Sequence, residues 1–344
     1  MTMFERYSLN SKTSLTNLKL VHVLGWDGKK LRVPKTVGYY REPQKMEFPI
    51  DLKYGFDKFV PMPPECFNVL HGMRYLMQLK PEELFDQPFD FCTNRRTLLE
   101  LIGLNRMKMR TLVASKFNGC IYIKTADNVK EGQADVIRMR DTYVFKLRQS
   151  LVVDKPGDLP DIEQPIIKGK QNYGIFTAEL DTIRLLYSAE LTGVENSELL
   201  GNFSDPAVLQ QCNLASIKIL PNHMQDDYYV NYRMRAWLLQ AHFANIKRIH
   251  LGFFNENGQI VAPLITEYST ELLNKQHWCL QCEMRVLRTF LEDISMRMAN
   301  EDCPYTTHIF HVKGSNVKYE VREGKNEYSF LDQEFIDFMK LNAC

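Results

Sequence analysis

The sequence predicts a mixed α/β fold of the α+β type, in which helices pack on mixed β-sheet. Several short runs alternate in polarity or are rich in β-branched and aromatic residues, which is typical of strands. Two long segments carry apolar residues at helical spacing instead. No internal repeat is present, and 44% of the 344 residues are hydrophobic, which is enough for a substantial core. We therefore expect one domain over residues 1–344.

The first part of the chain is expected to be an extended segment followed by short helices. Five prolines interrupt Glu42–Pro64, so this segment is predicted to cross the surface as an extended ribbon. A helix is predicted over Glu65–Leu79, where apolar residues recur at helical spacing. Shorter helices are predicted at Thr97–Leu104 and Arg110–Lys116.

Strands dominate the predicted middle of the chain, and long helices the later part. Asp154–Pro165 is rich in Pro and is predicted to be a loop, while Asn255–Gly258 is typical of a hairpin turn. The long helices are expected at Tyr228–Ala244 and Trp278–Met298. The predicted strands are Gly119–Lys124, Asp141–Val153, Tyr173–Ala178, Arg184–Leu191, Ala215–Leu220 and Arg248–Phe254.

Bulk charge and composition exclude several classes of protein. Lys and Arg number 43 and Asp and Glu 42, so attraction for a polyanion must come from local clusters of charge. The N-terminal sequence lacks the pattern of a secretory signal, and the eight Cys are expected to be free thiols in a reducing compartment. No apolar run of about 18 residues occurs, so we expect no membrane span. These features leave both nucleus and cytoplasm open.

Two segments carry basic and aromatic residues that are typical of RNA-binding surfaces. The basic run Asn94–Lys116 is interrupted by a single acid and could follow an RNA backbone, although it could equally be a solvated helical face. Trp237 and Gln240 are three residues apart on a predicted helix, so a Trp packed inward would hold Gln240 toward a pocket. Phe91, Phe117 and Tyr122 flank the basic run and are more typical of core than of base stacking.

Other chemistries are disfavoured. Cys279, Cys282, Cys303 and His308 suggest a zinc site, but the first pair lies in a helical pattern where zinc-knuckle geometry is not expected. No nucleophile signature or phosphate-binding Gly-rich loop is present, so covalent and nucleoside-triphosphate chemistries are disfavoured.

Polar residues on two predicted strands resemble a metal site that has lost acids. Glu190 and Thr192 lie at the end of one strand, and Ser216 and Lys218 lie on the next. Because a Mg²⁺ site requires several hard oxygen ligands, usually carboxylates, one clear acid is too few. The pattern predicts a nuclease-like scaffold that binds its ligand without cleaving it.

The chain resembles the DXO decapping exonuclease family over most of its length. The resemblance is carried by the order and spacing of GWDGKKLRVPKTVGYYREP, FPIDLKYGFDKFVPMPPE, ASKFNGCIYI, VVDKPG, RLLYSAE and WLLQAHF with IHLGFFNENGQIV. It implies a fold of two mixed β-sheets flanked by helices around a central pocket. It also implies action on RNA 5′ ends, by removal of aberrant caps or pyrophosphate and by 5′ to 3′ degradation with Mg²⁺ or Mn²⁺.

The resemblance also implies site positions, most of which have lost their acids. It assigns RNA contact to Arg95, Lys146, Glu190, Lys218 and Gln240, with Arg148 as the alternative to Lys146. The family's metal-binding positions fall on Lys146, Glu190, Thr192 and Ser216, of which only Glu190 is acidic. We therefore expect no catalytic residue, no bound metal and no cofactor.

These losses resemble the non-catalytic branch of the family. That branch implies a nuclear, germline, chromatin-associated RNA-binding pseudoenzyme with protein partners. It would protect nascent transcripts of the piRNA-precursor kind from decapping, degradation or termination. Two alternatives stay open: an active nuclease whose metal site is rebuilt with Asp141, Glu179 or Asp181, and a scaffold that only binds proteins.

Overall fold

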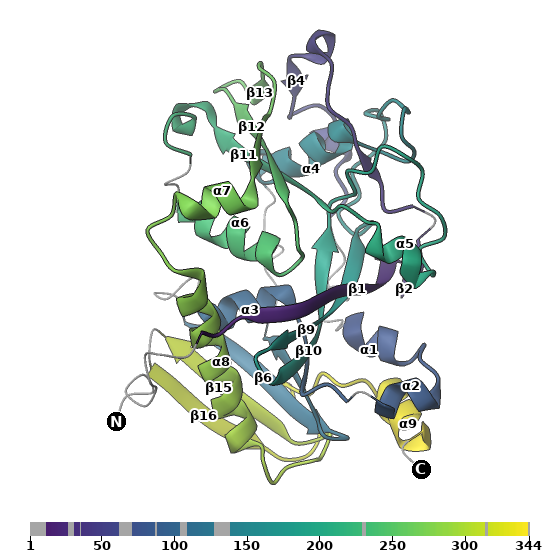
Figure 1. The fold of residues 1–344 in the computed structure, drawn as a ribbon, viewed down its shortest axis with the longest axis vertical. Helices are drawn as coiled ribbons and strands as arrows, with labels where there is room; N and C mark the ends of the chain where they lie inside the picture. Colours follow the sequence, from purple (N-terminus) through teal and green to yellow (C-terminus); the bar gives the residue numbers. More distant parts are fainter. Residues whose placement is uncertain are drawn as a thin grey trace.

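The fold consists of two mixed β-sheets with helices packed around them (Figure 1). The computed structural model describes residues 12–26, 31–34, 36–61, 71–86, 88–103, 109–126, 138–228, 232–313 and 316–342. Figure 1 shows the larger sheet in the lower half of the molecule and the smaller sheet in the upper half, beside α4 and α6. The predicted fold of two mixed sheets flanked by helices is confirmed.

In the described residues the larger sheet has nine strands. Its central strand pairs, β10 with β5 and β5 with β7, are parallel, and the flanking pairs are antiparallel. In spatial order the strands are β16 (Asn316–Arg322), β15 (Thr307–Lys313), β6 (Arg110–Phe117), β7 (Cys120–Thr125), β5 (Phe91–Asn94), β10 (Ile183–Leu191), β9 (Asn172–Leu180), β1 (Leu15–Trp26) and β2 (Leu31–Arg32).

The smaller sheet is built around the parallel pair of β11 and β12. The remaining pairs are antiparallel, and a separate short ladder joins two further strands. The sheet contains β11 (Ala215–Pro221), β12 (Arg248–Phe254), β13 (Gln259–Ile260), β4 (Ile50–Asp51) and β14 (Ile265–Tyr268), and the ladder joins β3 (Tyr39–Tyr40) to β8 (Val152–Val153).

Helices cover both sheets, and the longest, α8, packs its apolar stripe into the main core. None of the helices in the described part of the chain is long and apolar enough to cross a membrane. The α-helices are α1 (His71–Leu76), α2 (Pro81–Asp86), α3 (Arg95–Ile102), α4 (Met139–Leu151), α5 (Pro206–Gln210), α6 (Tyr232–His242), α7 (Ser269–Asn274), α8 (Leu280–Arg297) and α9 (Gln333–Asn342). Short 3₁₀ helices span Lys45–Glu47, Phe56–Lys58 and Asn222–Met224.

Most predicted elements are present, with ends shifted by a few residues. The five strands predicted from Gly119 onward, other than Asp141–Val153, correspond to β7, β9, β10, β11 and β12. The hairpin turn is confirmed, since the amide of Gly258 donates to the carbonyl of Asn255 and Gly258 has φ 74°. Much of the predicted helix Glu65–Leu79 lies outside the described residues, and α1 occupies its later part. The loop prediction for Asp154–Pro165 is also confirmed.

Two element predictions are wrong. Arg110–Lys116 forms strand β6, a central strand whose residues are mostly buried on both faces; such a strand shows no alternation of polarity. Asp141–Val153 forms helix α4 and only then the short strand β8. Its aromatic and β-branched residues favour a strand, but Leu147 and Leu151 are fully buried at helical spacing, and this packing overrides local propensity.

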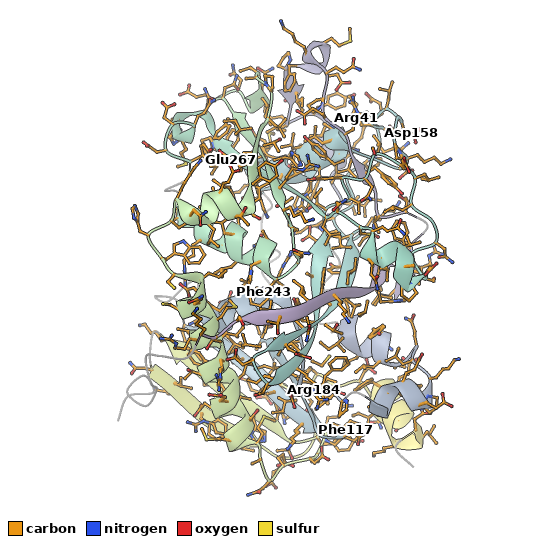
Figure 2. All side chains as sticks on the ribbon, in the orientation of Figure 1. Arg41, Phe117, Asp158, Arg184, Phe243 and Glu267 are labelled. Carbon is orange, nitrogen blue, oxygen red and sulfur yellow. The ribbon has the colours of Figure 1, made fainter. Side chains whose placement is uncertain are left out.

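The segment after β10 links the two sheets. The amide of Ala215 donates to the carbonyl of Gly193 at 2.9 Å, and the amide of Glu195 donates to the carbonyl of Asn213 at 2.7 Å. These bonds hold the end of β10 beside the start of β11. The Tyr187 hydroxyl on β10 also donates to the carbonyl of Phe243 at 2.8 Å, and Phe243 lies where the two sheets meet (Figure 2).

Candidate functional site

A cavity of about 540 Å³ opens between the two sheets. The end of β10 in the larger sheet and strand β11 in the smaller sheet line the cavity. The helices α4 and α6 and the first residue of α3 line it as well. Its lining residues are Arg95, Arg140, Asp141, Val144, Arg148, Glu190, Leu191, Thr192, Leu214, Ala215, Ser216, Lys218, Ile219, Pro221, Arg233, Trp237, Gln240, Ile246 and Phe254. Six of the seven residues that the sequence assigned to the site therefore converge on one cavity.

Arg95 joins three elements at the cavity. It is the first residue of α3, which begins after the N-cap Asn94, whose side chain accepts a hydrogen bond from the amide of Thr97 at 2.8 Å. One Arg95 Nη donates to the carbonyl of Gln240 and the other to that of Glu190, each at 3.2 Å. Burial lowers the pKa of Arg95, partly offset by the nearby Glu190 carboxylate. Arg95 therefore holds β10 and α6 together at the cavity and contributes a positive charge to it.

Glu190 forms an ion pair with Arg148. Glu190 lies at the end of β10, and its Oε1 accepts a hydrogen bond from Nη1 of Arg148 on α4. Burial alone would raise the pKa of Glu190, but the charges of Arg148, Arg95 and Lys218 outweigh it and hold this pKa below its ordinary value. The carboxylate is therefore ionised at neutral pH and already committed to a cation.

Lys218 is the cationic group of β11. Its Nζ donates to Oε1 of Gln240 at 2.8 Å and lies 5.8 Å from the ring centroid of Trp237. Burial lowers the pKa of Lys218 to about 7, with further lowering by Arg148 and Arg95 and partial compensation by Glu190. The charge of Lys218 is therefore sensitive to pH near neutrality. Trp237 is buried and, like Gln240, lies on α6 and lines the cavity.

Thr192 and Ser216 bring neutral hydroxyls to the cavity. They lie next to each other in space because the backbone bonds between residues 193–195 and 213–215 hold their segments together. Ser216 is buried, and Thr192 is half-buried. A hydroxyl can donate or accept a hydrogen bond, but it does not supply the negative charge of a carboxylate.

The placement of Lys146 in this cavity is corrected, since the structure places Arg148 there. Because residues 146 and 148 lie on a helix, their side chains point about 160° apart around its axis. Lys146 Nζ donates to Oε1 of Gln149 at 3.0 Å and to the carbonyl of Ile162 at 2.8 Å. It lines a separate cavity of about 550 Å³ together with Tyr54, whose ring centroid is 4.7 Å away.

The cavity lining is strongly cationic in the residues that the structure describes. Arg140 and Arg148 lie on one face of α4 with Val144, a spacing of four residues that would have identified them had the segment been predicted as a helix. The acidic members are Asp141 and Glu190. The full set of basic lining residues is Arg95, Arg140, Arg148, Lys218 and Arg233.

The other acids proposed for a rebuilt metal site lie elsewhere. Glu179 accepts a hydrogen bond from Nδ2 of Asn17 at 2.8 Å, and Asp181 pairs with Arg288 at 2.7 Å. Neither residue lines the cavity. Asp141 does line it, so it is the one of the three candidates that could supply an oxygen there.

The basic run Asn94–Lys116 does not form a continuous RNA-binding surface in its described part. Arg110 is buried and donates to the carbonyl of Glu100, while Lys116 Nζ donates to the carbonyls of Met298 and Ala299 at 3.3 and 3.4 Å. Residues 104–108 lie outside the described part of the chain. Phe91, Phe117 and Tyr122 are core residues, as their strand spacing indicated.

The zinc hypothesis is also not supported by the described residues. Cys279 and Cys282 are exposed at the start of α8, whereas Nδ1 of His308 is hydrogen-bonded to the Tyr319 hydroxyl at 2.7 Å. No group of three or more His, Cys, Asp or Glu residues in the described ranges is arranged to hold a metal ion.

The structure thus defines a two-sheet α/β protein with a cationic cavity between the end of β10 and strand β11. A family described as RAI1 like PD-(D/E)XK nuclease matches residues 29–336, and the chain belongs to that family. The predicted DXO-type family is thereby confirmed.

Individual relatives are distant in sequence but similar in fold. The chain is 22% identical to the decapping and exoribonuclease protein Rai1 of Drosophila melanogaster over 265 residues, which is 74% of this chain and 69% of that protein. The crystal structure of Scheffersomyces stipitis Rai1 has a TM-score of 0.75 at 14% identity, covering 97% of this chain and 100% of that one. Candida albicans Rai1 in complex with pU5-Mn²⁺ has a TM-score of 0.76 at 14% identity, covering 96% of each chain.

The residues at the cavity do not suit a divalent ion such as the Mn²⁺ of the Candida albicans Rai1 complex. The motif (D/E)XK in the family's description corresponds, by the resemblance described above, to Ser216-Ile-Lys218, which keeps the lysine and lacks the acid. The described lining offers two carboxylates, and one of them is paired with Arg148. Mg²⁺ and Mn²⁺ prefer several anionic oxygens, so five basic groups around two acids oppose their binding.

Proposed function

We propose that this chain is a catalytically inactive member of its family that binds RNA 5′ ends in the cavity between the two sheets. The phosphate of the RNA would contact Arg95, Arg148 and Lys218, with Gln240 orienting Lys218 through their hydrogen bond. Arginine and lysine both recognise phosphate, the former through paired donors. The catalytic and metal-ligand roles of the family would be absent, and no cofactor would be required.

One observation carries the proposal: the lining has five basic residues and two acidic ones, with hydroxyls at Thr192 and Ser216. Hydrolysis of a phosphodiester in this family would require metal ions to activate water and stabilise the leaving oxygen. A cationic lining retains affinity for the phosphate and lacks the ligands for those ions. Binding and cleavage are therefore separable in this cavity.

The test measures binding and cleavage of the same RNA. The purified chain is incubated with pU5 and with a longer 5′-phosphorylated RNA in the presence of Mn²⁺, and the products are resolved on a gel. Fluorescence anisotropy gives the affinity in parallel. We expect binding with no shortening or decapping of the RNA, under conditions in which Drosophila Rai1 serves as the positive control. Degradation that is lost on Glu190→Gln would refute the proposed inactivity.

The biological setting is proposed from the loss of acids at the site. This loss resembles that in the fly protein Cutoff, a non-catalytic member of the family. By that resemblance the chain would act in the nucleus on nascent piRNA-precursor transcripts, shielding their 5′ ends from decapping, degradation and termination. Rhino and Deadlock would be its protein partners. Co-purification of these two proteins with the tagged chain from germline nuclei tests this setting separately from RNA binding.

A second candidate function is an active nuclease with a rearranged acidic site. It is supported by Asp141, an exposed acid in the first turn of α4 that lines the same cavity as Glu190. This candidate predicts Mn²⁺-dependent RNA cleavage that is abolished by Asp141→Asn as well as by Glu190→Gln. If the chain is catalytically inactive, the RNA keeps its full length with the unsubstituted chain and with both variants.

A further inference from the structure

By the resemblance to the family, Glu190 and the position at or near Arg148 correspond to metal-ligand positions, and in this chain the two residues form an ion pair. Glu190 is the acid that the chain retains, and Arg148 reaches its Oε1 from α4. Arg95 donates to the backbone carbonyls of Glu190 and Gln240, and Lys218 donates to the side chain of Gln240. Among the described cavity residues, Arg148 is therefore the cation bonded directly to this carboxylate.

We propose that the Arg148 guanidinium replaces the divalent cation of the site, so that the cavity binds a terminal RNA phosphate without metal. This inference rests on the proposed function and specifies how the phosphate is held. A divalent ion in such a site joins carboxylate ligands to phosphate oxygens. A guanidinium has five N–H donors arranged in a plane, so it can also bridge two anions, with one set of donors on Glu190 and another on the phosphate.

The unused donors of Arg148 support this role. Nη1 is bonded to Glu190, while Nε is buried and has no hydrogen-bond partner among the described residues. The Arg148 side chain as a whole keeps 20% of its surface exposed and lines the cavity, so the guanidinium edge that faces the cavity can donate to a bound anion. The central carbon of the Arg148 guanidinium lies 5.7 Å from the centroid of the Phe145 ring, within the range of a cation–π contact.

The charge balance around the pair also favours an anion over a second cation. The charges of Arg148, Arg95 and Lys218 all lower the pKa of Glu190, and Arg148 and Arg95 lower the pKa of Lys218, so the four groups lie close together. A metal ion entering this position would have to displace Arg148 from Glu190 and would meet Arg95 and Lys218. A phosphate would meet three cations and one carboxylate that is already neutralised.

Metal dependence of RNA binding is the direct test. The affinity of the full chain for 3′-labelled pU5 is measured by anisotropy in excess EDTA and again in millimolar Mn²⁺. We expect the same affinity in both buffers. A loss of affinity in EDTA that Mn²⁺ restores would overturn the inference, although the chain would still bind RNA as proposed above.

Substitutions of Arg148 provide the second arm. Arg148→Gln removes the guanidinium and adds no acid, so we expect pU5 to bind about ten- to a hundredfold more weakly in both buffers, the effect of losing a charge-assisted hydrogen bond. Arg148→Glu places a second carboxylate beside Glu190 and should weaken binding in EDTA but regain affinity in Mn²⁺, because an ion can then be held between the two acids.

The matched control is Arg140→Glu, which makes the same change of charge two helical turns earlier on the same face of α4. We expect weaker binding for this variant and no recovery in Mn²⁺. Equal Mn²⁺ recovery in the Arg148→Glu and Arg140→Glu variants would overturn the inference, because it would show a non-specific response to added acid. Thermal unfolding of each variant, measured beforehand, restricts the comparison to folded protein.

Discussion

Raising the pH from 7 to 9 is expected to weaken binding of 5′-phosphorylated RNA, because Lys218 loses its charge in this range. With a pKa of about 7, Lys218 is about half protonated at pH 7 and about one part in a hundred protonated at pH 9. The terminal phosphate has its second pKa near 6, so it stays doubly ionised throughout this window and does not mask the effect.

The size of the effect is limited by the contact that is lost. If only the chain with protonated Lys218 binds the RNA, each pH unit above 7 should raise the Kd by up to about tenfold. The total increase in Kd is limited by the free energy of one charge-assisted hydrogen bond, roughly 1.5–3 kcal/mol, which corresponds to about 10- to 150-fold in Kd. Anisotropy titrations of pU5 at constant ionic strength measure this dependence, since salt alone changes the affinity for phosphate.

Lys218→Arg is the control, because arginine remains charged up to pH 9 and its titration curve should be flat. Loss of folding does not imitate the effect. The pKa of Lys218 is lower in the folded chain than the ordinary 10.5, so the unfolded chain binds more protons between pH 7 and 10.5, and stability rises with pH there. A flat curve for the unsubstituted chain, parallel to that of Lys218→Arg, would refute the argument.

Three further predictions concern a residue of the cavity, a residue outside it and a turn of the smaller sheet. Arg95→Met should lower the free energy of unfolding by about 2–5 kcal/mol, since it leaves the carbonyls of residues 190 and 240 without their donor. Urea unfolding measures this loss, with substitution of the exposed Arg96 by Met as the control. Equal urea midpoints for the two variants would contradict the prediction. Lys146→Met should leave the affinity for pU5 unchanged, because Lys146 faces another cavity, and a loss comparable to that of Arg148→Gln would return Lys146 to the RNA site. Gly258→Ala should destabilise the fold by about 1–3 kcal/mol, because Gly258 has φ 74° and an added Cβ would lie 2.5 Å from the Tyr143 hydroxyl oxygen; an unchanged melting temperature in differential scanning fluorimetry would contradict this.

The strands that the sequence predicts well are those with one strongly apolar face or a short apolar run ended by a clear break. RLLYSAEL and ASIKIL are of this kind, and β10 and β11 begin and end within a residue or so of the prediction. Strand β6 was missed because its residues are buried on both faces and give no period of two. Helix α4 was missed because Thr142, Tyr143 and Val144 favour a strand locally, and the packing of Leu147 and Leu151 is a property of the tertiary fold.

The candidate site depended on more than spacing. Arg95 and Gln240 are 145 residues apart and meet through a backbone carbonyl, a contact that no local pattern indicates. The resemblance to the family placed them together, and the cavity geometry agrees with it. The same resemblance left Lys146 and Arg148 as alternatives, because a choice between residues two apart requires the secondary structure of the segment. Once α4 is a helix, only one of the two can face the cavity.

The retention of Glu190 follows from the charges around it. Arg95, Arg148 and Lys218 repel one another, as the lowering of the Lys218 pKa by both arginines indicates. Glu190 is the acid that pairs with Arg148 and raises the pKa of Lys218 toward its ordinary value. Without this carboxylate, three cations would share the end of β10 with less compensation, and Lys218 would lose its proton more readily. In the proposed phosphate-binding cavity, Glu190 would therefore still be required to position Arg148 and to offset the charge of its cations.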